Sequence, residues 1–192
     1  MNSAQINGLA EAIYQQNVEA GWYSNPETGE PLEHRNVPEM FALMHSELSE
    51  ALEHWRKDTM DDHLPDLLGL HVELADTAIR ILDFAGYQRL VMWADASRLP
   101  WKWQGPVSAH LAEIHQKISE ACHFWCDWSA GTRWSQAAAT ANSLSTALRQ
   151  LEILAHEVNC DLWHVVDLKL AYNRERADHK IENRKKPGGK KA

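Results

Sequence analysis

The chain has 192 residues, a formal net charge of −8, a hydrophobic fraction of 44% and a charged fraction of 24%, which suit one packed globular domain. The negative charge argues against non-specific binding to nucleic acid. No apolar run approaches the roughly 18 residues of a membrane span, and no signal peptide opens the sequence. Three cysteines without framework spacing favour a reducing compartment, so we expect a cytoplasmic protein without a membrane partner.

Helical periodicity recurs from end to end, and strand signals are almost absent. The sequence therefore predicts an all-α helical bundle of about six helices. Turn residues, prolines and glycines place these helices at about 3–19, 37–57, 65–85, 107–127, 133–157 and 160–179. Pro38 suits the first turn of the second helix, and Gly86 is a natural residue to end the third. The tryptophan-rich stretch at 87–106 is typical of a connector.

Two segments of the chain resemble each other, MHSELSEALEHWRK (44–57) and IHQKISEACHFWCD (114–127). The identical residues, at a spacing of 70, are His45, Ser49, Glu50, Ala51 and Trp55, which fall on His115, Ser119, Glu120, Ala121 and Trp125. The repeat predicts two related helical hairpins about a pseudo-twofold axis, at about 37–86 and 107–157. The recurring histidine favours a packing or capping role.

Two acidic signatures in the first hairpin are the main candidates for chemistry, Glu47-x-x-Glu50 and Glu73-x-x-Asp76. On a helix, each spacing places both carboxylates on one side, and the short connection lets the helices pack antiparallel. Four such carboxylates make a site for a hard cation, Mg²⁺ first, with Mn²⁺ as a substitute. Glu47 falls inside the apolar arc of its helix, where an unpaired carboxylate is costly. For Glu73 and Asp76 alone, a solvated helix face is the ordinary explanation.

The second hairpin lacks this set of acids. Lys117 and Glu120 match Glu47 and Glu50 at the spacing of 70. Asn142 and Ser145 match Glu73 and Asp76 at a spacing of 69, which also places TAIRILDFA (77–85) over TALRQLEIL (146–154). A cation site cannot be assembled from one carboxylate, one ammonium group and two neutral side chains. The first repeat is therefore predicted to be active and the second to be a degenerate structural partner, in which Lys117 could form a salt bridge.

The segments FALMHSELSEALEHWRK and HVELADTAIRILDFAG, with LKLAYNRERADHK near the end, resemble the all-α nucleoside triphosphate pyrophosphohydrolases, the MazG-like group related to the dimeric dUTPases. The resemblance is specific for about 37–86 and 160–176 and weak over 88–158. It implies a hydrolase of nucleotide metabolism that converts a nucleoside triphosphate substrate, (d)NTP, to (d)NMP and pyrophosphate. Its implied Mg²⁺ ligands are Glu47, Glu50, Glu73 and Asp76.

The resemblance also implies roles for further residues. Glu47 or Glu50 would be catalytic, accepting a proton from the attacking water. The element Lys-x-x-x-Asn-x-x-Arg is met in this chain, and its members would contact the substrate phosphates: Lys169, Asn173 and Arg176. The order of the elements implies a single MazG-like domain at 1–179.

The base end of the site is less defined by the sequence. Trp22, in a segment that resembles the Gly-Trp-Trp preceding the motif in relatives, is a candidate for stacking on the base, although tryptophans are often core residues. Asn17, with Gln15 and Gln16, could offer amide hydrogen bonds to a pyrimidine, although polar residues at a helix end are common. A base-specific dUTPase-like or dCTPase-like enzyme and a non-catalytic nucleotide-binding protein stay open as alternatives.

The C-terminal end is basic, and nearly half of the 19 Lys and Arg residues lie from Lys169 onward. We expect a flexible tail at 180–192, which is either a solvated end or a segment that closes over an anionic ligand. Residues 177–187 are extra relative to the family pattern. Association into a homodimer also stays open, because tryptophan-rich connectors often become interfaces.

Overall fold

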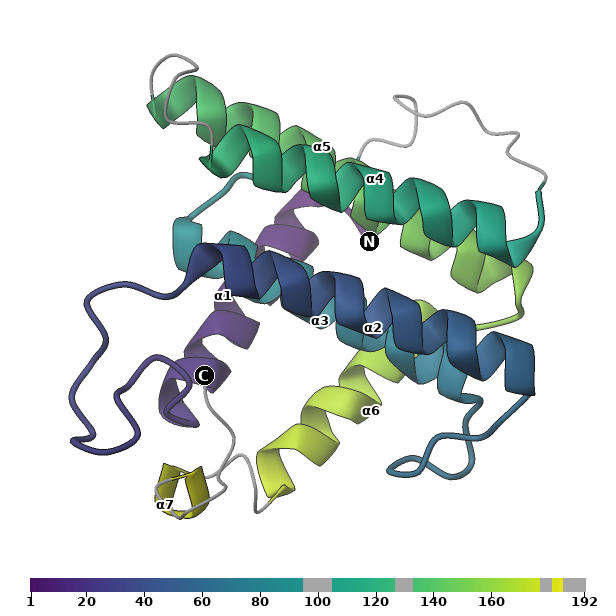
Figure 1. The fold of residues 1–192 in the computed structure, drawn as a ribbon, viewed down its shortest axis with the longest axis horizontal. Helices are drawn as coiled ribbons and strands as arrows, with labels where there is room; N and C mark the ends of the chain where they lie inside the picture. Colours follow the sequence, from purple (N-terminus) through teal and green to yellow (C-terminus); the bar gives the residue numbers. More distant parts are fainter. Residues whose placement is uncertain (95–104, 127–132, 177–180, 185–192) are drawn as a thin grey trace.

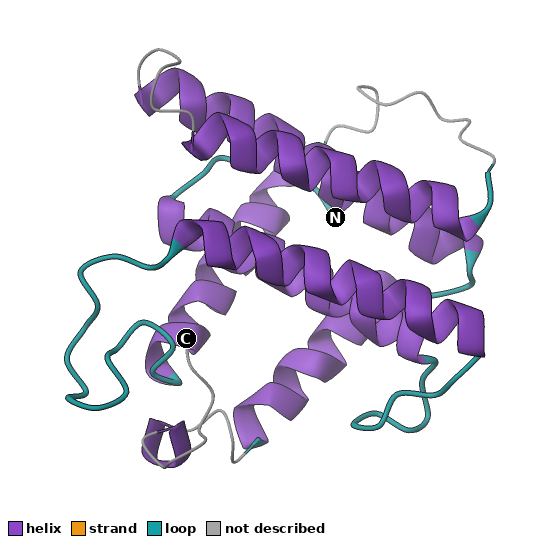
Figure 2. Ribbon diagram, viewed as in Figure 1, coloured by secondary structure: helices purple, strands orange, loops and turns teal. Residues whose placement is uncertain are grey.

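The structure is a computed structural model that describes residues 1–94, 105–126, 133–176 and 181–184. Within these ranges the chain is all-helical and holds no β-strand, as the sequence predicts (Figure 2). The seven helices are α1 (Ser3–Glu19), α2 (Val37–Lys57), α3 (Gly69–Gln88), α4 (Val107–Cys126), α5 (Arg133–Glu157), α6 (Leu162–Glu175) and α7 (Ile181–Arg184). No helix in the described ranges is both long and apolar enough to cross a membrane.

Two helical hairpins organise the fold (Figure 1). α2 and α3 form one hairpin, α4 and α5 form the other, and α2 lies alongside α4. α3 also contacts α1, α5 and α6, so most of its residues are buried. A helix in that central position can carry few polar side chains, and each of them needs a partner inside the protein.

The predicted repeat has a counterpart in the packing of α2 against α4. His45 and His115, which are equivalent in the repeat, lie against each other with their Nδ1 atoms 2.8 Å apart and their rings stacked at 5.1 Å between centroids. Residues that a twofold axis relates can meet only near that axis. The contact therefore supports two related hairpins, while the relation between them stays a prediction.

The third helix begins at Gly69, four residues later than the predicted start at Pro65. The side chain of Asp61 accounts for the difference. Its Oδ1 accepts hydrogen bonds from the backbone N–H groups of His63, at 2.9 Å, and Leu64, at 2.6 Å. A local turn of this kind offers the backbone an alternative to the helix, so the chain stays in a loop up to Leu68.

Gly86 does not end the third helix, which continues to Gln88 and stops at Arg89 in the left-handed region, with φ 53°. The glycine instead allows α1 to pack close against α3. A Cβ atom at position 86 would lie 2.4 Å from the carbonyl oxygen of Ala10 and 2.7 Å from the Cβ of Tyr14. Only a residue without a side chain lets the two helix backbones meet there.

The sixth helix is shorter than predicted. Asp161 caps its first turn by accepting a hydrogen bond from the N–H of His164 at 3.2 Å, so the helix begins at Leu162 and runs to Glu175. The last part of the predicted range, like residues 95–104 of the predicted connector, lies outside the described residues. The short helix α7 lies within the tail predicted for 180–192, of which 185–192 also lie outside the described residues.

Substitution of Gly86 by alanine should lower the free energy of unfolding by about 1–3 kcal/mol, because the new methyl group overlaps backbone atoms of α1. Gly8 is a matched control in α1, since a Cβ there meets nothing within 4 Å. Gly8→Ala should raise the free energy of unfolding by about 0.5–1 kcal/mol through helix propensity alone. Urea unfolding of both variants measures these changes. Equal changes in the free energy of unfolding for Gly86→Ala and Gly8→Ala would contradict the close packing of α1 on Gly86.

The His45–His115 contact should make stability depend on pH. Burial lowers the pKa of both imidazoles, and for His115 the neighbouring His45 lowers it further. The unfolded chain then binds more protons than the folded one below about pH 6.5, so the free energy of unfolding should fall as the pH drops through that value. His115→Gln should flatten this slope in urea unfolding at several pH values. His34→Gln, at an exposed histidine, is the control and should leave the slope as it is.

Candidate metal centre

Three of the four predicted acids come together where α2 and α3 pack in the first hairpin. Glu47 of α2 and Glu73 and Asp76 of α3 each place a carboxylate oxygen within 4.8 Å of the others. Glu47 is 7% exposed and Glu73 is 6% exposed, which agrees with the position of Glu47 inside the apolar arc of its helix. The antiparallel hairpin brings the two signatures face to face, because each is spaced by one helical turn.

Cationic side chains surround this cluster. Nζ of Lys169 donates to Oδ2 of Asp76 at 2.8 Å, and Nε of Arg80 donates to Oε1 of Glu47. Lys169 is only 4% exposed, so its ion pair with Asp76 is shielded from solvent and depends on good geometry. These contacts join α2, α3 and α6 at one place.

Glu73 is the acid whose charge is least compensated. Its Oε2 is buried and has no hydrogen-bond partner among the described residues, while Nε2 of His54 lies 3.9 Å from its Oε1. Burial, and then the charges of Asp76, Glu47 and Glu50, raise the pKa of the Glu73 carboxyl to about 9. An orphaned buried carboxylate oxygen costs free energy unless a proton or a cation neutralises it. The arrangement therefore fits the oxygen-ligand chemistry of a hard divalent cation.

Asp76 also has a raised pKa, of about 6. Burial is the largest cause, and the ammonium group of Lys169 opposes it. One lysine and one arginine thus face three carboxylates in the site. Part of the negative charge is left uncompensated, and a bound cation could neutralise it.

Glu50, the fourth predicted ligand, does not join the group of three. It is exposed at the edge of α2, and its Oε1 accepts a hydrogen bond from Oγ of Ser46 at 3.1 Å. Its charge nevertheless acts on Glu73. Glu50 also lines a surface hollow of about 290 Å³ with His54 and Asp62, so it borders the buried cluster on the side that opens to solvent.

Two of the three residues predicted to contact phosphate, Lys169 and Asn173, share one face of α6 at a spacing of four residues. Lys169 contacts Asp76. One turn further, Oδ1 of Asn173 is buried without a hydrogen-bond partner among the described residues. Arg176 follows at the end of α6, with its guanidinium carbon 5.5 Å from the centre of the Tyr172 ring.

Asp83 is a half-buried acid that the motif does not contain. The hydroxyl of Tyr23 donates to its Oδ1 at 3.0 Å, and the side chain of Asn17 lies near enough to favour the charged carboxylate. Burial raises the pKa of Asp83 to about 6 in spite of these donors and of Arg35 and Arg80. Its spacing of seven residues from Asp76, two helical turns, was the signal available in the sequence. Asn17 of α1, which was predicted to lie at the base end, is thus next to Asp83, on the side of α3 that also carries Glu73 and Asp76.

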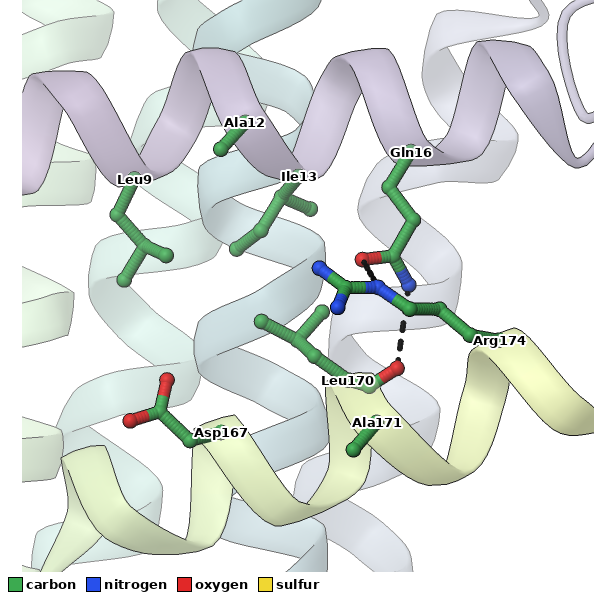
Figure 3. A pocket seen from close by; sticks show the side chains of 8 residues that line it. All are labelled: Leu9, Ala12, Ile13, Gln16, Asp167, Leu170, Ala171 and Arg174. Atoms are coloured by element: carbon green, nitrogen blue, oxygen red, sulfur yellow. Dashed lines mark hydrogen bonds between the residues drawn. The ribbon is translucent and has the colours of Figure 1, made fainter.

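The glutamines predicted beside Asn17 point elsewhere. Nε2 of Gln16 donates to the carbonyl oxygen of Leu170 at 3.2 Å, and its Oε1 accepts from Nε of Arg174 at 2.9 Å (Figure 3). Gln16, Leu170 and Arg174 line a pocket of about 250 Å³ between α1 and α6 that shares no residue with the carboxylate cluster. Gln15 is exposed and bonds to Glu11. Neither glutamine joins Asn17 at Asp83.

Comparison of the chain with protein-family models, with curated proteins and with solved structures gives no match. The family resemblance therefore stays a prediction that depends on the motifs and on the geometry just described.

Substitution of Glu73 by glutamine should stabilise the protein in EDTA at neutral pH, because the folded protein must hold this carboxyl protonated, with its pKa raised to about 9, whereas glutamine is neutral in both the folded and the unfolded chain. We expect a gain on the order of 1 kcal/mol, or about 2–4 °C in Tm for a chain of this size. Addition of Mg²⁺ should raise the Tm of the wild type and not that of the variant. Glu53→Gln, at an exposed glutamate of α2, is the control and should keep the Mg²⁺ response. An equal Mg²⁺ response in Glu73→Gln would exclude this site.

Proposed function

We propose that the chain is a divalent-metal-dependent nucleoside triphosphate pyrophosphohydrolase, which converts (d)NTP and water to (d)NMP and pyrophosphate. The observation that carries the proposal is the cluster of buried Glu47, buried Glu73 and half-buried Asp76, with the unpartnered Oε2 of Glu73 among its oxygens. A buried set of carboxylates from two helices has a ready explanation as a cation site and a poor one as a purely structural device.

Mg²⁺, or Mn²⁺ in its place, would be held by Glu47, Glu73 and Asp76, with Glu50 at the open side. The cation would neutralise the polyphosphate and lower the pKa of a bound water. Glu50 is suited to accept the proton of the attacking water, because it is exposed and accepts only one hydrogen bond that the structure describes, from Ser46. Glu47 is the alternative base, although Arg80 already donates to it.

The face of α6 supports binding of a polyphosphate chain beside the acids. Lys169 lies in contact with Asp76, Asn173 lies one turn further along the same face, and Arg176 directly follows the last residue of the helix. Lysine and arginine side chains hold phosphate oxygens through charge-assisted hydrogen bonds, and the amide of Asn173 can orient them. These residues would bind the pyrophosphate as its charge develops while the phosphoanhydride bond breaks.

The polar stripe of α3 supports a nucleotide as the substrate class. Glu73, Asp76, Arg80 and Asp83 recur at helical spacing along one side of the helix. Asp83 lies about 10 Å along the helix axis from Asp76, at about 1.5 Å per residue. That separation suits a phosphate at one end and a base at the other. A base-specific dUTPase-like or dCTPase-like activity would differ in the contacts at Asn17 and Asp83 and not in the acids.

A product assay tests the proposal. The protein is incubated with all canonical NTPs and dNTPs and with dUTP, in Mg²⁺ and in EDTA, and pyrophosphate is separated from phosphate. We expect Mg²⁺-dependent release of pyrophosphate together with the monophosphate. Nucleotide affinity without product would favour a non-catalytic nucleotide-binding protein, and turnover of a single base would favour the base-specific enzyme.

Glu50→Gln should lower Mg²⁺-dependent turnover by about 10²–10⁴-fold, because it removes the proton acceptor and a ligand from the open side of the site. The variant should unfold like the wild type, since Glu50 is exposed. Glu120→Gln is the matched control at the equivalent position of the second repeat, where the carboxylate pairs with Lys117 at 2.8 Å. It should keep nearly full turnover. Wild-type activity in Glu50→Gln would show that this acid is not part of the catalytic site.

A further inference from the structure

Arg184, at the end of α7, is buried against the loop that follows α1. It is 3% exposed, and its Nη1 donates to the carbonyl oxygen of Gly21 at 2.7 Å. Its guanidinium carbon lies 3.9 Å from the centre of the Trp22 ring. A planar cation at that distance covers one face of the indole and gains a cation–π attraction.

Trp22 is tied to the residues at the Asp83 end of the polar stripe. Its N–H donates to the carbonyl oxygen of Asn17 at 2.9 Å, and its own carbonyl oxygen accepts from Nη1 of Arg35 at 2.5 Å. Its neighbour Tyr23 donates to Asp83. Trp22 therefore stands at the end of the stripe where a nucleobase would lie if the phosphates were bound near Asp76.

We infer that Arg184 and the nucleobase of the substrate compete for the same face of Trp22, so that α7 is a built-in competitor at the base end of the site. The inference rests on the proposed function. Guanidinium groups and nucleobases are both flat and both stack on indole rings. At 3.9 Å from the ring centre, Arg184 leaves no room for a base between itself and Trp22.

The contact between Arg184 and Trp22 depends on a short helix that can move away from the loop. α7 has four residues, too few for a helix that is stable alone, so its position depends on anchors such as Arg184. The guanidinium of Arg184 also lies near the charge of Arg35, and burial together with that charge lowers the pKa of Arg184. Burial of the Arg184 cation near the like charge of Arg35 is unfavourable, and this favours departure of Arg184 when another planar group takes its place.

Calorimetric titration with the α,β-imido analogues of dUTP, dCTP, dATP and dGTP in Mg²⁺ tests the inference. Removal of the competing group raises the fraction of protein that is ready to bind, and the apparent Kd falls by that factor. We expect Arg184→Ala to bind the preferred analogue several-fold to about tenfold more tightly than the wild type. Arg174→Ala removes a matched charge from α6, where the guanidinium bonds to Gln16 instead, and should leave the Kd unchanged. An unchanged or higher Kd in Arg184→Ala would overturn the inference.

Hydrogen exchange separates this inference from the proposed function. In the wild type, addition of the same analogues should speed amide exchange in residues 181–184, because the base displaces Arg184. Faster exchange without turnover of any nucleotide would refute the enzyme and keep the competition at Trp22. Turnover with slower or unchanged exchange in 181–184 would keep the enzyme and refute the competition.

Discussion

The fold depends on the neutralisation of buried negative charge on its central helix. α3 is packed against four other helices, yet it carries Glu73, Asp76 and Asp83 on one side. Carboxylates in such a place are tolerated only when the neighbouring elements supply donors or positive charge. α6 supplies Lys169 to Asp76, and the loop after α1 supplies Tyr23 to Asp83. The helices around α3 therefore converge on the same polar stripe that defines the candidate site.

The second hairpin, α4 and α5, has no cluster of carboxylates to neutralise in its described part. Lys117, at the position of Glu47, pairs with Glu120 on its own helix at 2.8 Å, as the sequence allowed. Ser145, at the position of Asp76, is buried, and its Oγ accepts a hydrogen bond from the backbone N–H of Trp93 at 3.1 Å. No group of three or more acids, histidines or cysteines at metal-binding distance occurs in the described part of α4 and α5. The α4–α5 hairpin thus packs in the same bundle without such acids, which favours a chemical reason for their presence in α2 and α3.

The sequence predicted what depends on local pattern and failed where distant contacts decide. The bounds of α1, α2 and α5 follow from periodicity and capping residues, and they were predicted correctly. Gly86 was wrongly assigned to a helix end because only the approach of Ala10 explains it. Asp83 had the right spacing, but spacing alone cannot distinguish a buried acid from a solvated one. The burial of Arg184 on Trp22 joins residues far apart in the chain, and no local pattern indicates it.

The ion pair between Lys169 and Asp76 links stability to the proposed chemistry. Asp76 is a candidate metal ligand and Lys169 a candidate phosphate ligand, yet in the structure each is the partner of the other. A metal–polyphosphate complex presents the opposite charge to each: positive to the carboxylate and negative to the ammonium group. Binding of the complex would therefore replace the Lys169–Asp76 ion pair by two new ion pairs, one for each residue. Neither charge would be left buried without a partner, which is the costly outcome for a buried ion pair. A lone cation or a lone polyphosphate would satisfy only one side, so this pair favours binding of the two together.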